Sequence, residues 1–185
     1  MAGAIPVLPS RRDRGRHVKV LVAGIGNIFL GDDGFGVEVV KHIDKCSLPD
    51  DVRNGVTIGD FGIRGVHLSY ELLNGYDALV LIDAMPLGEA PGTVVTFEPD
   101  VESVDPTSVD AHSMNPAVVL GLLASMGGHV PRVVIVGCQP MTTDEGIGLS
   151  EPVLAAVAPA VDTVRQVLTD IHTDIHSSAQ KELQS

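Results

Sequence analysis

The feature that most constrains this chain is a series of short apolar runs, rich in Val, Ile and Leu, that alternate with segments of helical periodicity. Runs of this kind, closed by Gly or Asp, are typical of strands that are buried on both faces of a sheet. The predicted strands are 18–23, 56–58, 78–82 and 133–136. The predicted helices are 34–46, 66–73, 116–126 and 151–168. Because strand and helix alternate, we expect a largely parallel sheet.

A further run at 93–97 follows the preceding strand too closely for a helical crossover, so we expect it to pair antiparallel. The predicted fold class is therefore α/β, a three-layer αβα arrangement with a mostly parallel (mixed) twisted sheet and helices on both faces. The length of 185 residues suits one such domain. We expect a flexible basic head at 1–17, a single α/β domain at 18–170 and a polar tail at 171–185.

Charge and composition exclude several classes of partner. The chain has 24 acidic and 12 basic residues, a net charge of −12, and 3% aromatic residues with no Trp. An acidic surface repels nucleic acid and anionic lipid, and few rings are available for base stacking. No segment approaches the roughly 18 apolar residues of a membrane span. We therefore expect no nucleic-acid partner and no membrane partner.

The two cysteines, Cys46 and Cys138, lie far apart and fit neither a disulfide framework nor a Cys-x-x-Cys motif. A reducing compartment is the simpler interpretation, so we expect a cytoplasmic protein, and we expect a monomer. His172 and His176 fall in the predicted tail, and we do not expect them to be metal ligands.

Polar side chains gather at the predicted strand ends. In an open α/β sheet the carboxyl ends of parallel strands meet at one edge, where ligands bind. The side chains expected at this edge are Asn27, Asp32, Asp33, Asp60, Asp83, Gln139 and His112, the last of which precedes a predicted helix. Several acids and one imidazole beside a glycine-rich turn predict a divalent-metal site. For His112 the alternative is an ordinary surface histidine.

Each acid also has a structural alternative. Asp32 and Asp33 could both cap the following helix, but capping needs one of them and Asp32 suits it, which leaves Asp33 for the site. Asp83 ends an apolar strand, where a carboxylate costs energy unless a ligand or hydrogen bonds compensate, and a capped turn is the alternative. Asp60 could activate water or cap a turn. Arg64 could pair with Asp60 or bind a substrate carboxylate.

The glycine-rich turn after the first strand also looks like a dinucleotide-binding fingerprint, with Asp60 as the ribose-binding acid. Phe29, however, occupies the place of the third glycine, and Asp32 and Asp33 put negative charge where a pyrophosphate would sit. We therefore do not favour a nucleotide site. The chain also lacks the motifs of a serine nucleophile, and neither cysteine stands near a base.

The segment 24–36, with the sequence GIGNIFLGDDGFG, resembles the opening signature of the nickel-iron hydrogenase maturation endopeptidases. Other landmarks follow in that family's order. They are the strand end at 82–84 (IDA), His112 before an apolar helix, and 136–140 (VGCQP) followed by 146–150 (GIGLS). The resemblance covers about 18–168, nearly the whole predicted domain.

This resemblance implies an endopeptidase that removes the carboxyl-terminal extension from a hydrogenase large-subunit precursor after nickel insertion. Nickel would be presented by the substrate rather than permanently bound. The resemblance implies that Asp33, Asp83 and His112 recognise this metal, and that Asp60 joins Asp33 and Asp83 in the catalytic set. Asp33 stands where some relatives have Glu, and Arg64 lies in a segment that is more neutral in the family. A metal-polarised carbonyl and an Asp60-activated water are both compatible with these residues.

Two other functions compete with this one. The first is a hydrolase that carries its own zinc or manganese and cleaves a small amide or ester, which would bind metal tightly when purified alone. The second is a non-catalytic module that senses a nucleotide or metal at the same strand edge, since a fold does not fix a function. Such a module would show no turnover with any precursor.

Overall fold

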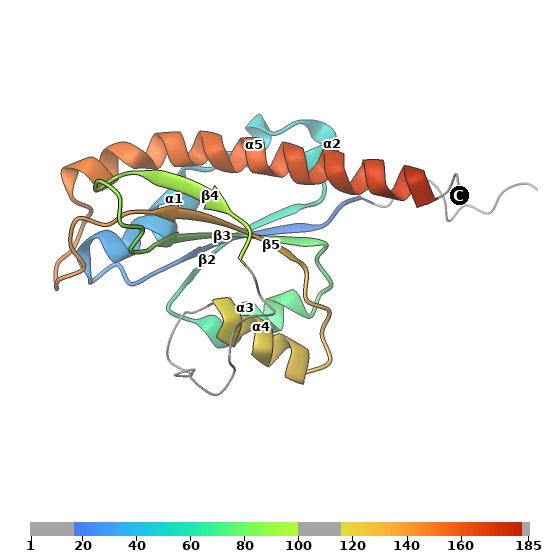
Figure 1. Ribbon diagram of the computed structural model, residues 1–185, viewed down its shortest axis with the longest axis horizontal. Helices are drawn as coiled ribbons and strands as arrows, with labels where there is room; N and C mark the ends of the chain where they lie inside the picture. Colours follow the sequence, from blue (N-terminus) through green and yellow to red (C-terminus); the bar gives the residue numbers. More distant parts are fainter. Residues whose placement is uncertain (1–16, 100–115, 183–185) are drawn as a thin grey trace, which may run out of the picture.

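The computed structural model describes residues 17–99 and 116–182, which form an α/β fold around one five-stranded sheet (Figure 1). In spatial order the strands are β2 (Val56–Gly62), β1 (Val20–Ile25), β3 (Ala78–Ala84), β5 (Arg132–Cys138) and β4 (Val94–Phe97). The first four run parallel, and β4 pairs antiparallel with β5 at the sheet edge. The predicted mixed sheet, including its antiparallel run, is confirmed.

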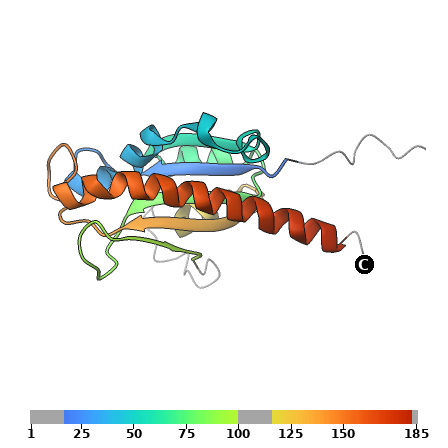
Figure 2. The same cartoon turned by 90° about the horizontal axis from the view of Figure 1, so that it is seen from above.

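Helices cover both faces of the sheet, as the alternating pattern predicts. One face is covered by α1 (Phe35–His42) and α5 (Glu151–Glu182), and the other by α3 (Gly65–Leu72) and α4 (Pro116–Ser125) (Figures 1 and 2). A short helix, α2 (Asp50–Arg53), contacts α5. The arrangement is the predicted three-layer αβα.

Two apolar clusters, one on each face of the sheet, join the three layers. Along β1, Val20 and Val22 enter the cluster with α1 and α5, whereas Leu21, Ala23 and Ile25 enter the cluster with α3 and α4. Every side chain of β1 is therefore buried, which explains why the strand reads as an unbroken apolar run rather than as an alternating one.

The last helix is longer than the sequence pattern predicts. It continues to Glu182, although the pattern predicts an end at 168 and a polar tail from 171. Ile171, which is 1% exposed, and the partly buried Ile175 continue the apolar stripe of Val164 and Leu168. Their spacing of three and four residues keeps them on one helix face. The predicted end of this helix at 168 is therefore wrong, and the chain is helical as far as Glu182.

The first helix is shorter than the predicted span of 34–46. Ile43 leaves the helix in an extended conformation, with ψ 107°, and Asp44 then accepts a hydrogen bond from the amide of Cys46 at 2.9 Å. Such local bonding of an aspartate competes with continued helix. His42, which the pattern places on the buried face, is exposed, and its Nδ1 lies 2.9 Å from the carbonyl oxygen of Glu38.

The four parallel strands end at one edge of the sheet, on the left of Figure 1, where α5 begins. We refer to it as the carboxyl edge. The loops after β1, β2, β3 and β5 all lie there, so residues distant in sequence converge. Among the helices of the described part of the chain, none is long and apolar enough to cross a membrane.

Candidate active site

A glycine folds the loop after β1 tightly onto itself. Gly26 has φ +125°, and a Cβ added there would lie 1.8 Å from the carbonyl oxygen of Asp33. The close approach brings Asp33 back to the strand end, where the amide of Asn27 donates to Asp33 Oδ2 at 2.6 Å. Glycine is therefore needed at position 26 because the backbone of Asp33 comes close to it. The glycine does not serve to bring the backbone close to a pyrophosphate. The Asn27 amide that a phosphate would use is bound to Asp33.

Asp32 anchors a second loop to this turn. Its fully buried carboxylate accepts hydrogen bonds from the amides of Met141, Thr142 and Ser150 at 2.6 to 3.1 Å and from the Ser150 hydroxyl at 2.8 Å. Burial alone raises the pKa of Asp32, but these bonds outweigh it and lower the pKa. The predicted capping of α1 by Asp32 is wrong, since no side chain caps α1. Ser150, which precedes α5, donates its hydroxyl to Asp32.

Asp33 and Asp83 come together at the end of β3. Asp33 lies in the short 3-10 helix η2 (Gly31–Gly34), and Asp83 follows five buried residues of β3 and is itself half-buried. Burial raises the pKa of Asp83 to about 7, and the negative charge of Asp33 adds to the rise. Two of the predicted metal ligands are thus electrostatic neighbours. A bound cation would relieve their repulsion.

Asp60 stands apart from this pair, on the other side of β1. Gly24 of β1 pairs with Asp60 of β2 on one side and with Ile82 of β3 on the other. Since side chains alternate along a strand, Asp60 shares the α1 side of the sheet with Ile82, and Asp83 is directed toward the opposite side. Two strand spacings, roughly 10 Å, separate Asp60 from β3.

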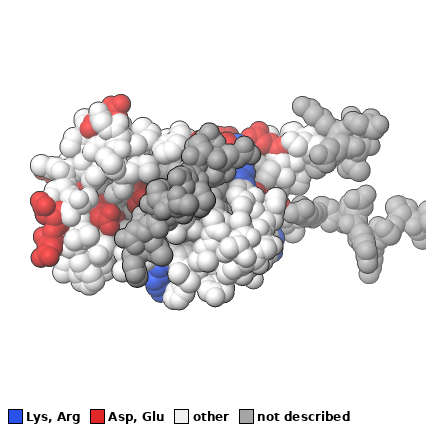
Figure 3. All heavy atoms as spheres, turned by 60° about the horizontal axis from the view of Figure 1, so that its bottom comes forward, with Lys and Arg blue, Asp and Glu red and all other residues white. Residues whose placement is uncertain are grey.

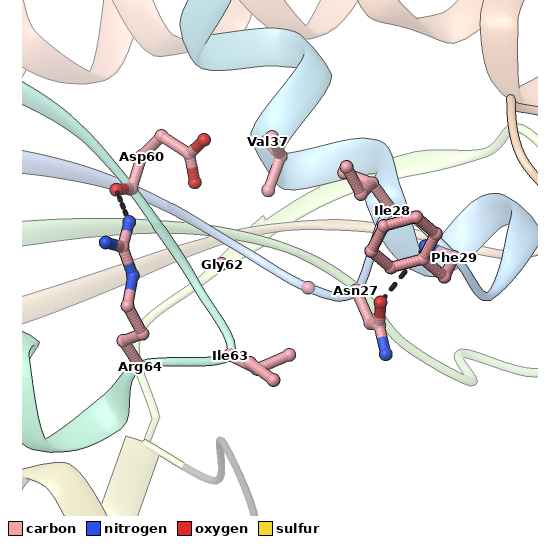
Figure 4. Close-up of a pocket in the computed structure, with 9 residues that line it drawn as sticks. Asn27, Ile28, Phe29, Val37, Asp60, Gly62, Ile63 and Arg64 are labelled. Carbon is pink, nitrogen blue, oxygen red and sulfur yellow. Dashed lines mark hydrogen bonds between the residues drawn. The ribbon is translucent and has the colours of Figure 1, made fainter.

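Arg64 holds the backbone around Asp60 rather than its carboxylate. The Arg64 Nη2 donates to the carbonyl oxygen of Asp60 at 2.9 Å, and the Nε donates to the carbonyl oxygen of Phe61 at 3.2 Å. Figure 4 shows the Asp60 carboxylate turned away from Arg64 and toward Val37. The side chains of Asp60 and Arg64 therefore do not form the ion pair that the sequence suggested.

A pocket of about 290 Å³ lies between Asp60 and the turn after β1 (Figure 4). Its walls are largely apolar and come from Ile28, Phe29, Val37 and Ile63. The carboxylate of Asp60 stands on the same wall as Val37. An apolar pocket with a few polar groups orients a ligand, and this volume suits a short stretch of peptide rather than a large cofactor.

Exposed apolar side chains surround the carboxyl edge. We refer to the following residues as the apolar rim: Ile28, Phe29, Ile63, Met141 and Ile147. Phe29 is 62% exposed and Ile147 is 84% exposed. Their loops are joined, because the amide of Gly146 donates to the carbonyl oxygen of Phe29 at 2.9 Å. Clustered exposed apolar residues mark an interaction surface. Figure 3 shows acidic side chains gathered at the same end of the molecule.

Other residues predicted at the edge have different places. His112 lies outside the described residues. Gln139 supports the loop after β3, because its Oε1 accepts from the amides of Leu87 at 2.6 Å and Gly88 at 3.0 Å. Burial, with a contribution from Asp32, raises the pKa of Cys138 to about 11. This cysteine therefore remains a thiol at neutral pH.

Sequence reasoning missed the apolar rim and the anchoring of the loop after β5. The signal that could have revealed the rim is an isolated large apolar residue between glycines, as in Gly146-Ile147-Gly148, where no helix or strand pattern uses the side chain. Within residues 17–99 and 116–182, no group of three or more His, Cys, Asp or Glu side chains is arranged to hold a metal ion.

Comparisons with known proteins point in one direction. A family model described as hydrogenase maturation protease, HycI, matches residues 37–167. The hydrogenase expression/formation protein HupD of Rhizobium leguminosarum bv. viciae is 33% identical over 153 residues, which are 81% of this chain and 74% of HupD. The hydrogenase 2 maturation protease of Escherichia coli K12 is 31% identical over 156 residues, covering 83% and 92%. The structure of the E. coli hydrogenase maturating endopeptidase HybD matches with a TM-score of 0.67 at 30% identity, covering 82% of this chain and 93% of HybD.

Proposed function

The chain belongs to the hydrogenase maturation protease family, and from this premise we propose that it removes the carboxyl-terminal extension of a hydrogenase large-subunit precursor once nickel is in place. It is thus a hydrolase of the endopeptidase class. Nickel enters this proposal as part of the substrate, held by the precursor when the two proteins meet.

The observation that carries the proposal is the pairing of Asp33 with Asp83 at the carboxyl edge. Burial and mutual repulsion make this pair unfavourable in the free protein, as the raised pKa of Asp83 indicates. Neighbouring carboxylates that repel each other are suited to complete the coordination of a metal brought by another molecule. We assign His112 as the third group that contacts the nickel, since imidazole is a common nickel ligand.

Asp60 is suited to the proton transfers of peptide hydrolysis. Its carboxylate is exposed and lines the pocket, while Arg64 holds its backbone carbonyl oxygen at 2.9 Å. In the proposed step Asp60 takes a proton from a water molecule as that water attacks the scissile carbonyl, and it returns the proton to the leaving amine. Its separation from Asp83 leaves space for the peptide to cross the end of β1 between the two acids.

The apolar rim supports a protein substrate rather than a small amide or ester. Ile28, Phe29 and Ile63 of the rim line the pocket. They remain exposed in the free chain, as Phe29 and Ile63 illustrate at 62% and 64%. Burial of such side chains against a partner stabilises a complex by roughly 25 cal/mol for each Å² removed from water. A small substrate would leave most of the rim exposed.

The test is incubation of the purified full-length chain with a nickel-loaded large-subunit precursor and with its nickel-free form, followed by intact-mass analysis. The expected result is a single loss of the carboxyl-terminal extension in the nickel-loaded sample alone. Asp83→Asn and His112→Ala should abolish it. Glu145→Gln, which removes an exposed acid from the loop after β5, serves as the matched control and should cleave normally.

Two other outcomes would overturn the proposal. Cleavage of both precursor forms would remove the role of nickel and favour a hydrolase with its own metal. Cleavage of neither form, across every precursor made by the same cell, would favour a module that senses a ligand without turnover.

A further inference from the structure

Two histidines on the last helix form a second cluster, far from the carboxyl edge. His172 and His176 lie one turn apart on α5 and beside α2, which comes just before the amino end of β2. In Figure 1 this part of α5 is at the opposite end of the molecule from the carboxyl edge. The cluster exists because α5 continues through residues that the sequence assigned to a tail.

The two rings contact each other edge to face, with their Nε2 atoms at the contact. These atoms lie 3.2 Å apart, and the ring centroids lie 4.3 Å apart. Two Nε2 atoms at this separation cannot both carry a hydrogen, so at least one of them has a free lone pair, which either accepts a hydrogen bond from the other ring or is available to a metal ion. Nitrogens bound to one metal at 2.0 to 2.1 Å and 3.2 Å apart subtend an angle of about 100°, close to tetrahedral or square geometry.

The surroundings of His172 resemble those of a metal-bound imidazole. Its Nδ1 lies 3.7 Å from Asp51 Oδ2 of α2, so the Nε2 is the nitrogen that remains for a ligand. A carboxylate on the second ring nitrogen orients a ligating histidine and strengthens it as a donor. The His172 side chain is only 14% exposed, which restricts the ring to few orientations.

We propose that His172 and His176 form a two-histidine site for a late first-row divalent metal ion such as Ni²⁺ or Zn²⁺, with water completing the coordination. Histidines four residues apart on a helix face present their rings to the same point, and imidazole is a preferred ligand of these ions. Asp51, whose Oδ2 lies 3.7 Å from the Nδ1 of His172, is the carboxylate placed to orient the first ligand once a metal ion binds. The net charge of −12 adds a general attraction for cations.

The test is calorimetric titration of the full-length chain with Zn²⁺ and with Ni²⁺. Asp83→Asn serves as the parent so that the carboxyl edge does not contribute. The expected result is one metal ion per chain, with affinity at least about tenfold lower in His172→Gln and in His176→Gln, and a smaller loss in Asp51→Asn. His42→Gln is the matched control, because His42 is another histidine on a helix but, among the described residues, has no second histidine beside it, and it should bind as the parent does.

A second measurement shows whether the histidine variants lose metal binding only because they fail to fold. Zn²⁺ should raise the melting temperature of the parent and of His42→Gln, and should leave His172→Gln unchanged, while circular dichroism shows equal helix content in all three proteins. Equal affinity in the parent and in both histidine variants would overturn the site. So would the absence of metal binding to the parent up to millimolar concentration.

Discussion

The carboxyl of Asp83 follows five buried residues of β3 and has Asp33 as its electrostatic neighbour. A residue that served only the fold would be better replaced by an apolar or neutral one, because an ionised carboxylate there lacks the solvation it has in water. Asp32, one residue before Asp33, shows the contrast. It is fully buried yet has a lowered pKa, since four hydrogen bonds stabilise its charge. Burial thus has opposite outcomes for the two acids, because only Asp32 has enough hydrogen bonds to offset it.

Asp83 should destabilise the free protein in a pH-dependent way. The unfolded chain loses the Asp83 proton near its ordinary pKa of 3.8, whereas the folded chain keeps it up to about 7. The free energy of unfolding therefore falls as pH rises between these values and levels off above about 7. Asp83→Asn should raise the free energy of unfolding by about 1 to 3 kcal/mol at pH 8 and by less at pH 5.

Urea unfolding at the two pH values measures this effect. Glu145→Gln, an exposed acid, should change the free energy of unfolding by less than about 0.5 kcal/mol at either pH. A stability gain in Asp83→Asn that is equal at both pH values, or a loss at pH 8, would contradict the assignment of Asp83 as an uncompensated acid.

Among the elements, the loop after β5 depends on Asp32 for its position. Asp32→Ala leaves three amides without their acceptor, so we expect the free energy of unfolding to fall by about 3 kcal/mol. The contribution of Asp32 is present above pH 3.8 and is lost as pH falls through its lowered folded pKa. Ser150→Ala removes only the hydroxyl bond and should cost about 1 kcal/mol.

Hydrogen exchange resolves where this stability is lost. In Asp32→Ala the amides of Met141, Thr142 and Ser150 should exchange much faster than in the parent protein. The exchange rates of the amides of β1 and β3 should change only as much as the global free energy of unfolding requires. Unchanged exchange in these three amides would contradict the anchoring role of Asp32.

The turn after β1 should tolerate no side chain at Gly26. Gly26→Ala places a Cβ 1.8 Å from the carbonyl oxygen of Asp33, so η2 has to move and the Asn27–Asp33 hydrogen bond is lost. We expect a loss of about 3 kcal/mol or more in the free energy of unfolding and loss of cleavage. Gly88→Ala is the matched control, because Gly88 also has positive φ, +76°, but open space around it.

Gly88→Ala should cost only about 1 kcal/mol of backbone strain and leave cleavage intact. Equal effects of the two substitutions on the free energy of unfolding and on cleavage would show that backbone strain alone, rather than the contact with Asp33, makes Gly26 necessary.

For the whole molecule, the alternating pattern was sufficient to predict the sheet, its layers and the edge at which the acids meet. Buried parallel strands need continuous apolar runs, and these runs are visible in the sequence. What could not be predicted depends on contacts between distant segments. Asp32 binds residues more than a hundred positions away, and α5 passes its expected end because Ile171 and Ile175 meet the core on the α5 face of the sheet. His112 and its predicted part in metal recognition stay a prediction.

The apolar rim should matter for the complex and not for the fold. Phe29→Ser and Ile147→Ser should each weaken precursor binding about tenfold or more while changing the free energy of unfolding by less than about 0.5 kcal/mol. Tyr70→Ser is a matched control, because Tyr70 is 59% exposed on α3, outside the rim. Biolayer interferometry with an immobilised precursor measures the affinities. Equal binding by all four proteins would exclude the rim from the interface.

The central claim is that Asp33 and Asp83 contact the nickel of the substrate directly. The measurement that tests it most directly is a thermodynamic cycle of four binding affinities. The protein with Asp83 and its Asp83→Asn variant are each titrated with nickel-loaded and with nickel-free precursor. All proteins carry Asp60→Asn, and intact-mass analysis verifies that no extension is lost during the measurement. The account predicts that nickel tightens binding markedly when Asp83 is present and that this gain disappears in Asp83→Asn. An equal gain from nickel with either residue would contradict the claim.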